Sequence, residues 1–163
     1  MIRFLTVLGA LLLTACQTVP DQTNFSREQV ATLTQEGFVP VEENYELGLS
    51  NKVLFGFDRS ELMSETSTEL VRLTRVLMSV GIGGVTIEGH TDNKGASDYN
   101  LELSKRRAET VKAAMIAGGM NGATVRTIGY GETDPIEDNA TEKGQSENRR
   151  VVIVVTPGDA LHN

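Results

Sequence analysis

The stretch Glu88-Gly89-His90-Thr91-Asp92-Asn93-Lys94-Gly95 decides the fold, because it joins a strand-like pattern to a helix-like one. Residues 84–90 alternate in polarity as they lead into this acidic, glycine-punctuated turn, which is typical of a strand. Residues 99–117 carry apolar side chains at helical spacing, at Leu101, Ala108, Val111 and Met115. The sequence here predicts a strand, a loop and a helix.

Three polar residues around this loop form a candidate binding site. Asp92 follows the expected strand, and Asn100 and Arg107 are seven residues apart, which places them within about 20° of one another on a helix. A carboxylate opposed to a guanidinium suits a zwitterion, because one binds the ammonium and the other grips the carboxylate with two hydrogen bonds. An ordinary ion pair that ties the loop to the helix explains the same residues equally well.

These residues resemble the central signature of the OmpA-like peptidoglycan-binding domain, and the resemblance covers about residues 52–156. In that family the Asp after His-Thr and the Arg before Ala hold the zwitterionic side-chain end of meso-diaminopimelate in the cell-wall stem peptide. The sequence departs from the family at Gln145, where an Arg is common, and at Met63-Ser64, which replaces a common Lys-Pro. The resemblance implies a peptidoglycan site made of Asp92, Arg107, Asn100, Asp58, Thr91, Gly95, Arg149 and Arg150.

Two of these positions are not resolved by the sequence. Arg149 and Arg150 point in opposite directions along a strand, so only one of them can face the ligand, and either choice is open. Asp58 falls at the end of an expected strand and lies on the same side as Asp92 if the two strands are parallel.

The periodicities and the resemblance together predict an α/β (α+β) two-layer sandwich. We expect a mixed sheet of four strands, with two main helices, 64–80 and 99–117, on one face. The strands are expected near residues 52–57, 84–90, 124–129 and 149–155. The expected buried residues of the helices are Leu70, Leu73, Leu77, Leu101, Ala108, Val111 and Met115.

The first residues predict export and lipidation. Residues 1–15 combine Arg3 with a short apolar run, which is the pattern of a signal peptide, and Leu13-Thr14-Ala15-Cys16 resembles a bacterial lipobox. The run is shorter than the roughly 20 residues that span a bilayer. Cys16, the sole cysteine of the sequence, is then a lipidation site with stable anchoring, and a buried free cysteine is the alternative. Gln17 in place of Asp favours the outer membrane by resemblance to the enteric sorting rule.

The residues before the domain predict a tether and an arm. Residues 16–25 read as a lipidated tether, residues 26–51 as a helix over 26–36 followed by an extended arm, and residues 157–163 as a tail. The segment over residues 25–56 resembles the YfiB-type outer-membrane lipoproteins, which sequester the periplasmic repressor YfiR of the diguanylate cyclase YfiN. The resemblance implies partner contacts at Leu33, Phe38, Tyr45 and Leu47, whereas simple packing of the arm on the domain is the alternative.

Composition narrows the function further. The net charge of −7 disfavours nucleic acid and anionic lipid as partners. The two histidines lack zinc-site spacing, and a hydrolase needs a nucleophile, a metal or an acid/base pair. His90 and Asp92 could be two metal ligands, but we expect His90 to order the loop by hydrogen bonds. We therefore expect a non-enzymatic protein without cofactor or metal, acting as a YfiB-like regulator or as a Pal-like tether to the wall. Homodimerisation is left open.

Overall fold

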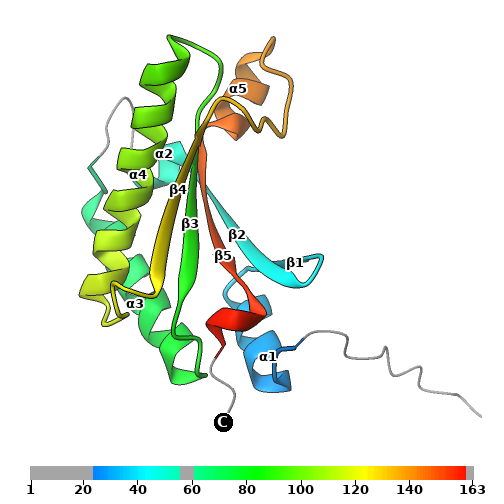
Figure 1. Cartoon of the computed structure of the whole chain (residues 1–163), viewed down its shortest axis with the longest axis vertical. Coiled ribbons are helices and arrows are strands. Elements are labelled where there is room, and N and C mark those ends of the chain that lie inside the picture. The colour runs from blue at the N-terminus through cyan, green and yellow to red at the C-terminus, as the bar shows by residue number, and fades with distance from the viewer. Residues whose placement is uncertain (1–23, 56–60, 161–163) are drawn as a thin grey trace, which may run out of the picture.

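The computed structural model describes residues 24–55 and 61–160, which form a mixed sheet with helices packed on it (Figure 1). The strand order is β1-β2-β5-β3-β4; β3 and β4 are parallel, and the other neighbours are antiparallel. The strands are β1 Val39–Val41, β2 Asn44–Ser50, β3 Val85–His90, β4 Val125–Gly131 and β5 Arg150–Val155. The helices are α1 Arg27–Gln35, α2 Asn51–Phe55, α3 Ser64–Ser79, α4 Ser97–Ala117 and α5 Glu142–Asn148, and a short 3-10 helix spans Pro157–Asp159. The mixed α/β architecture is confirmed, with five strands instead of four.

The prediction of a strand over residues 52–57 is wrong for residues 52–55. Residues 51–55 form the helix α2, and residues 56–60, which include Asp58, lie outside the described residues. On the side away from β3, β5 pairs with β2, from Tyr45↔Val155 to Ser50↔Arg150. A short continuous apolar run such as Val53-Leu54-Phe55 is equally compatible with a buried strand and a buried helix turn, so periodicity alone could not decide.

The two long helices are confirmed, and the expected core is confirmed except at one residue. Leu101 is 37% exposed. The buried position one turn before Ser104 is taken by Asn100, so the polar residue and not its apolar neighbour faces the sheet. The other expected residues are buried, namely Leu70, Leu73, Leu77, Ala108, Val111 and Met115.

Glycines let the first half of α4 lie directly on the ends of β3 and β4. A Cβ at Gly89 would collide with the backbone oxygen of Ser104, and one at Gly131 would lie 3.1 Å from the backbone nitrogen of Leu101. Gly131 also has a positive φ of 57°, which favours glycine. This close approach brings the loop after β3 against the side chains of α4.

The N-terminal segment packs on the domain. The expected capping box of α1 is present, with Ser26 and Gln29 bonded reciprocally, and Gly37 ends the helix with a φ of 88°. Gln29 also donates from Nε2 to the carbonyl oxygen of Val80 at 3.1 Å, which ties α1 to the end of α3. Phe25 and Tyr45 meet edge to face with 5.3 Å between ring centroids. This segment therefore contributes Phe25, Leu33, Phe38 and Tyr45 to the hydrophobic core, whereas β1 is exposed.

Candidate functional site

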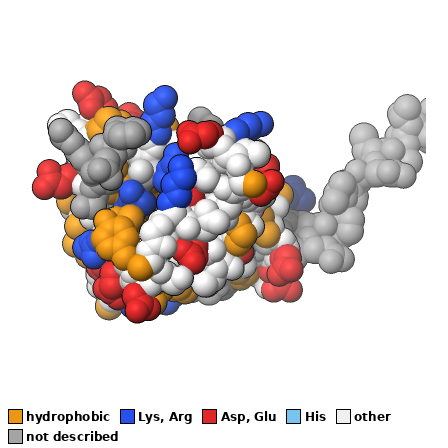
Figure 2. All heavy atoms as spheres, turned by 90° about the horizontal axis from the view of Figure 1, so that it is seen from above, with side chains coloured by type: hydrophobic (Ala, Val, Ile, Leu, Met, Phe, Trp, Pro, Cys, Tyr) orange, Lys and Arg blue, Asp and Glu red, His pale blue; other side chains and the backbone are white. Residues whose placement is uncertain are grey.

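The candidate site lies at the end of the sheet where the parallel strands β3 and β4 finish, at the top of Figure 1. Ends of parallel strands collect ligand-binding loops at one edge of a sheet. Thr91 and Asp92 follow β3, Asn100 and Arg107 come from α4, and Arg149 immediately precedes β5. Several Lys and Arg side chains lie across this end of the molecule (Figure 2).

Asp92 is buried, with only 6% exposure, and both of its carboxylate oxygens accept hydrogen bonds. Arg149 donates from Nη1 to Oδ2 at 2.6 Å, and the backbone amide of Lys94 donates to Oδ1 at 3.2 Å. Charge-assisted bonds of this kind hold a side chain in a fixed orientation. Arg149 is therefore the one of the two adjacent arginines that pairs with Asp92. Which of them faces the ligand stays a prediction.

Asn100 and Arg107 lie on the buried face of α4, as their spacing predicted. Asn100 donates from Nδ2 to the backbone oxygen of Asp92 at 3.3 Å. The guanidinium carbon of Arg107 lies 5.7 Å from the ring centroid of Phe55, at the end of α2. The ion-pair partner of Asp92 among the described residues is Arg149.

Arg150 belongs to a second cluster behind the loop. Its Nη2 donates to Asp134 Oδ2 at 3.0 Å, so the side chain is engaged away from Asp92. His90 is almost fully buried and stacks on Tyr130 with 5.2 Å between ring centroids. Its nearest carboxylate oxygen, on Asp134, is 3.5 Å from Nδ1.

The expectation that His90 orders the loop by hydrogen bonds is wrong. Neither of its ring nitrogens has a hydrogen-bond partner among the described residues. Burial lowers the pKa of His90 to about 4, and the nearby positive charge of Arg150 acts in the same direction. The loop is ordered by its backbone instead, because the amide of Thr91 donates to the carbonyl oxygen of Gly131 at 2.8 Å and Gly95 adopts a φ of 102°.

Two residues that the sequence reasoning missed belong to this end of the molecule. Glu132 accepts from Asn100 Nδ2 and from Ser97 Oγ, and so fixes the first turn of α4. Its position directly after β4, beside the end of a parallel neighbour, is a signal that could have identified it. Phe55, which lies against Arg107, was hidden by the wrong strand assignment.

Neither a metal site nor a membrane span is found in the described part of the chain. Residues 24–55 and 61–160 contain no group of three or more His, Cys, Asp or Glu that could hold a metal ion. Across the same residues, none of the helices is long and apolar enough to cross a bilayer. Cys16 lies outside the described residues.

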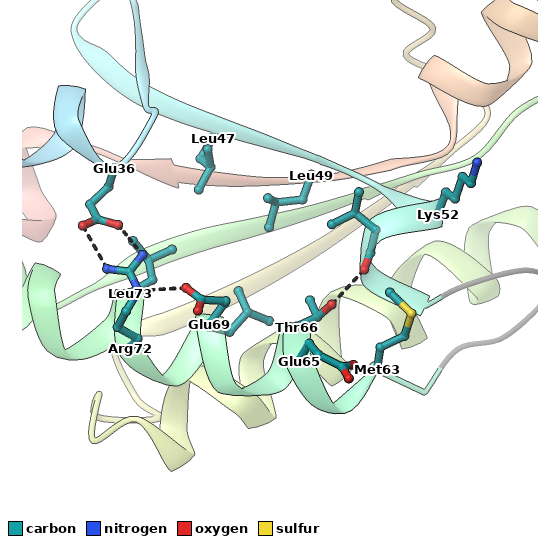
Figure 3. Close-up of a pocket in the computed structure, with 12 residues that line it drawn as sticks. Glu36, Leu47, Leu49, Lys52, Met63, Glu65, Thr66, Glu69, Arg72 and Leu73 are labelled. Atoms are coloured by element: carbon teal, nitrogen blue, oxygen red, sulfur yellow. Dashed lines mark hydrogen bonds and ion pairs between the residues drawn. The ribbon is translucent and has the colours of Figure 1, made fainter.

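A separate apolar groove of about 790 Å³ runs between β2 and α3 (Figure 3). Leu47 and Leu49 on β2 lie across from Leu73 on α3. One end carries an ion-pair network in which Arg72 binds Glu36 at 2.7 Å and Glu69 at 2.8 Å. From the other end, α2 contributes Lys52 and Val53, and Met63 and Thr66 also line the groove.

The four residues expected to contact a partner differ in how far they are buried. Leu33, Phe38 and Tyr45 are buried in the core, with exposures of 0%, 2% and 5%. Leu47 is half-buried and lines the groove. A partner that docks on the structure as it stands can reach only Leu47 among these four.

Comparison with known proteins identifies the class. Residues 54–149 match the OmpA family, and the chain belongs to this family. It is 45% identical over 152 residues to the outer-membrane lipoprotein YfiB of Pseudomonas aeruginosa, covering 93% of this chain and 89% of that protein.

Solved structures agree with the fold. The peptidoglycan-associated lipoprotein of Burkholderia pseudomallei superposes with a TM-score of 0.56 at 30% identity, over 63% of this chain and 86% of that one. A putative MotB-like protein of Desulfovibrio vulgaris gives a TM-score of 0.69 at 26% identity, over 80% and 87% of the two chains. These findings confirm the resemblance and the fold class predicted from the sequence.

Proposed function

We propose that this protein is a lipoprotein that binds peptidoglycan non-covalently, through the diaminopimelate of the stem peptide. The observation that carries the proposal is a buried carboxylate, Asp92, that Arg149 holds in one orientation at the end of the sheet to which α4 brings Asn100 and Arg107. A free amino acid group carries one positive and one negative charge, and Asp92 and Arg107 are complementary to them. Relatives of this chain include a protein named peptidoglycan-associated lipoprotein, which supports the wall as the ligand.

Arg149 gives the site its order before the ligand arrives. Its bond to Asp92 fixes the carboxylate, so that little conformational entropy remains to be lost on binding. The ligand ammonium then shares the negatively charged carboxylate of Asp92 with Arg149, and Arg107 binds the ligand carboxylate. Asn100 and Thr91 complete the wall of the site, with Gly95 leaving room at the loop.

The protein is anchored, in this proposal, to the outer membrane by lipid on Cys16. The relative from Pseudomonas aeruginosa, named an outer-membrane lipoprotein, supports this location. A Cys16→Ser protein should be released from the membrane and should incorporate no radiolabelled palmitate. Labelling of that variant would contradict the assignment.

We further propose that the protein acts as a YfiB-like regulator, which sequesters a periplasmic repressor of a diguanylate cyclase. The support is that the similarity to YfiB covers 93% of the chain, well beyond the residues that match the OmpA family. Leu47 is the arm residue placed to touch such a partner, and Leu33, Phe38 and Tyr45 hold the arm in place. A purely structural tether is the second candidate, favoured by the likeness to a peptidoglycan-associated lipoprotein and by the packed arm.

Calorimetric titration tests the wall site. The unlipidated Cys16→Ser protein, without its leader, is titrated with stem peptides that contain diaminopimelate or lysine; lysine lacks the terminal carboxylate and should bind poorly. Asp92→Ala or Arg107→Ala should lose about 2 to 5 kcal/mol of binding free energy, because each leaves an opposite charge desolvated and unpaired.

Matched controls are available on exposed helix surfaces. Asp98→Ala and Arg75→Ala remove the same charges from exposed positions on α4 and α3 and should bind normally. Thermal melts establish that each variant is folded. Equal affinity for the two peptides, or normal binding by a folded Asp92→Ala, would refute the proposed site.

A pull-down from periplasm separates the regulator from the tether. A regulator retains a specific periplasmic protein, and Leu47→Glu loses it while binding to sacculi is unchanged. If the groove variant and the parent retain the same proteins, the structural tether remains.

A further inference from the structure

A small exposed surface lies beside the proposed wall site and is not used by it. Tyr99 is 58% exposed, and the guanidinium carbon of Arg106 lies 6.0 Å from its ring centroid. The ring also borders the loop, since Tyr99 Cδ1 is 3.9 Å from where a Cβ on Gly95 would lie. Tyr99 and Arg106 each precede, by one residue, a member of the wall site on α4.

The charges at this end of the molecule single out Arg106. Arg149 is ion-paired with Asp92, and Arg150 with Asp134. Lys94 Nζ lies 3.6 Å from Glu142 Oε1. Arg106 takes part in no ion pair with any other residue in the described ranges. The acidic residues around it on α4 are engaged elsewhere, with Glu102 bound to Lys105 and Glu109 accepting from Thr127. Its guanidinium is exposed, held over a ring and available to an anion.

Helix geometry places this surface next to the side of α4 that carries Asn100 and Arg107. Consecutive residues on a helix diverge by about 100°, so Arg106 faces the surface adjacent to the one that Arg107 faces. Tyr99 borders the same loop that carries Asp92, so a stem peptide that leaves the wall site along the first turns of α4 passes over Tyr99 and Arg106.

We propose that Tyr99 and Arg106 bind the γ-linked glutamate that precedes diaminopimelate in the stem peptide. This inference rests on the proposed function. The γ-linkage leaves the α-carboxylate of that glutamate free, and a guanidinium binds a carboxylate with two parallel hydrogen bonds. The exposed ring of Tyr99 covers the methylene groups of the same residue, which are apolar. The protein would then recognise two charged residues of the stem peptide, glutamate and diaminopimelate, in place of diaminopimelate alone.

The test compares two stem peptides that both contain diaminopimelate. One carries glutamate with its free α-carboxylate, and the other carries isoglutamine, in which an amide replaces that carboxylate. Calorimetry with the Cys16→Ser protein should give up to about fivefold weaker binding of the isoglutamine peptide, as expected for loss of an ion pair at an exposed position.

Variants assign that difference to the two residues. Arg106→Gln should bind the two peptides equally, Arg106→Lys should recover part of the preference, and Tyr99→Ala should weaken both peptides. Lys112→Gln, which removes the same charge from a position further along α4, should keep the full preference. A preference for glutamate that survives in Arg106→Gln would overturn the proposal.

Failure of this inference differs from failure of the wall site. If the parent protein distinguishes diaminopimelate from lysine but binds glutamate and isoglutamine peptides equally, only the Tyr99 and Arg106 surface is disproved. If it does not distinguish diaminopimelate from lysine, the proposed function itself fails.

Discussion

The loop end of the sheet and the groove between β2 and α3 differ in which side chains they bury and which they expose. At the loop end, polar residues are buried and fixed by partners, as Asp92 is by Arg149. In the groove, apolar residues such as Leu47 and Leu49 stay partly uncovered, and charges lie at the end. A buried, satisfied polar cluster suits a small charged ligand, whereas an open apolar cleft suits a partner that brings its own apolar surface.

One short helix joins the two regions. In α2, the backbone amide of Asn51 donates to the carbonyl oxygen of Arg149 at 2.9 Å, and Phe55 lies against Arg107. Lys52 and Val53 of the same helix line the groove. The regions are thus neighbours through α2, and the predictions below ask whether they are also energetically separate.

The largest expected effect is on stability, from the arm. Leu33→Ala removes a fully buried side chain and should lower the free energy of unfolding by about 2 to 5 kcal/mol in urea titrations. Leu101→Ala, at a partly exposed position, is the matched control and should cost less. Binding of the diaminopimelate peptide by the folded Leu33→Ala protein should be unchanged; weakened binding would mean that the regions are coupled.

The second prediction concerns acid and the loop end. The unfolded chain binds a proton at His90 near pH 6.5, whereas the folded protein binds it only near pH 4, because burial lowers the pKa. The unfolding free energy should therefore fall as the pH is lowered from about 6.5 to 4, by up to about 3 kcal/mol from this residue.

His90→Phe keeps a ring against Tyr130 and removes the titration. Its unfolding free energy should depend less on pH over this interval than that of the parent. Identical pH profiles for the two proteins would show that His90 is not the titrating group.

The two regions also differed in how far the sequence could predict them. At the loop end, Asp92, Asn100 and Arg107 lie on neighbouring elements, so a strand, a tight loop and helix periodicity were enough to bring them together. Asp92 and Arg149 are 57 residues apart in the sequence. Which of the two adjacent arginines reaches Asp92 depends on where α5 ends and β5 begins. Local pattern cannot fix that.

The arm shows more plainly that local sequence patterns do not reveal long-range strand pairing. Alternation at Tyr45, Leu47 and Leu49 correctly indicated an extended segment, but its partner β5 lies about a hundred residues further along the chain. Without that pairing, Val53-Leu54-Phe55 looked like the first strand. The pairing of β2 with β5 places Tyr45 in the core, whereas β1 is exposed and Leu47 and Leu49 are only partly buried. The segment interpreted as a partner-binding arm is thus in part a strand of the sheet.

The third prediction refines the loop end. Asn100→Ala should weaken binding of the diaminopimelate peptide by about 0.5 to 1.5 kcal/mol, because it removes one neutral hydrogen bond to the backbone of Asp92 and leaves the charges in place. Thr110→Ala, further along the same helix, should have no effect in the same calorimetric titration. A loss as large as that of Asp92→Ala would mean that Asn100 positions the loop as a whole.

The smallest expected effect is at the end of the groove. Arg72 is half-exposed, so its pairing with Glu36 should contribute no more than about 1 kcal/mol to stability, and less at high salt. The hydrogen bond from Arg72 lowers the pKa of Glu36 below its ordinary value of 4.5. This stabilisation is therefore present above pH 4.5 and is lost as the pH falls through the lowered pKa. In the His90→Phe background, which lacks the histidine titration, Arg72→Gln should remove the salt-dependent part and the acid-dependent part that this pair contributes. Urea titrations at two salt concentrations and at pH 7 and pH 4 measure both. Arg75→Gln, one turn further along α3, removes an equal charge from outside the network and should retain both dependences. A salt dependence that persists in Arg72→Gln would place the electrostatic contribution elsewhere and leave the groove end held by its apolar contacts alone.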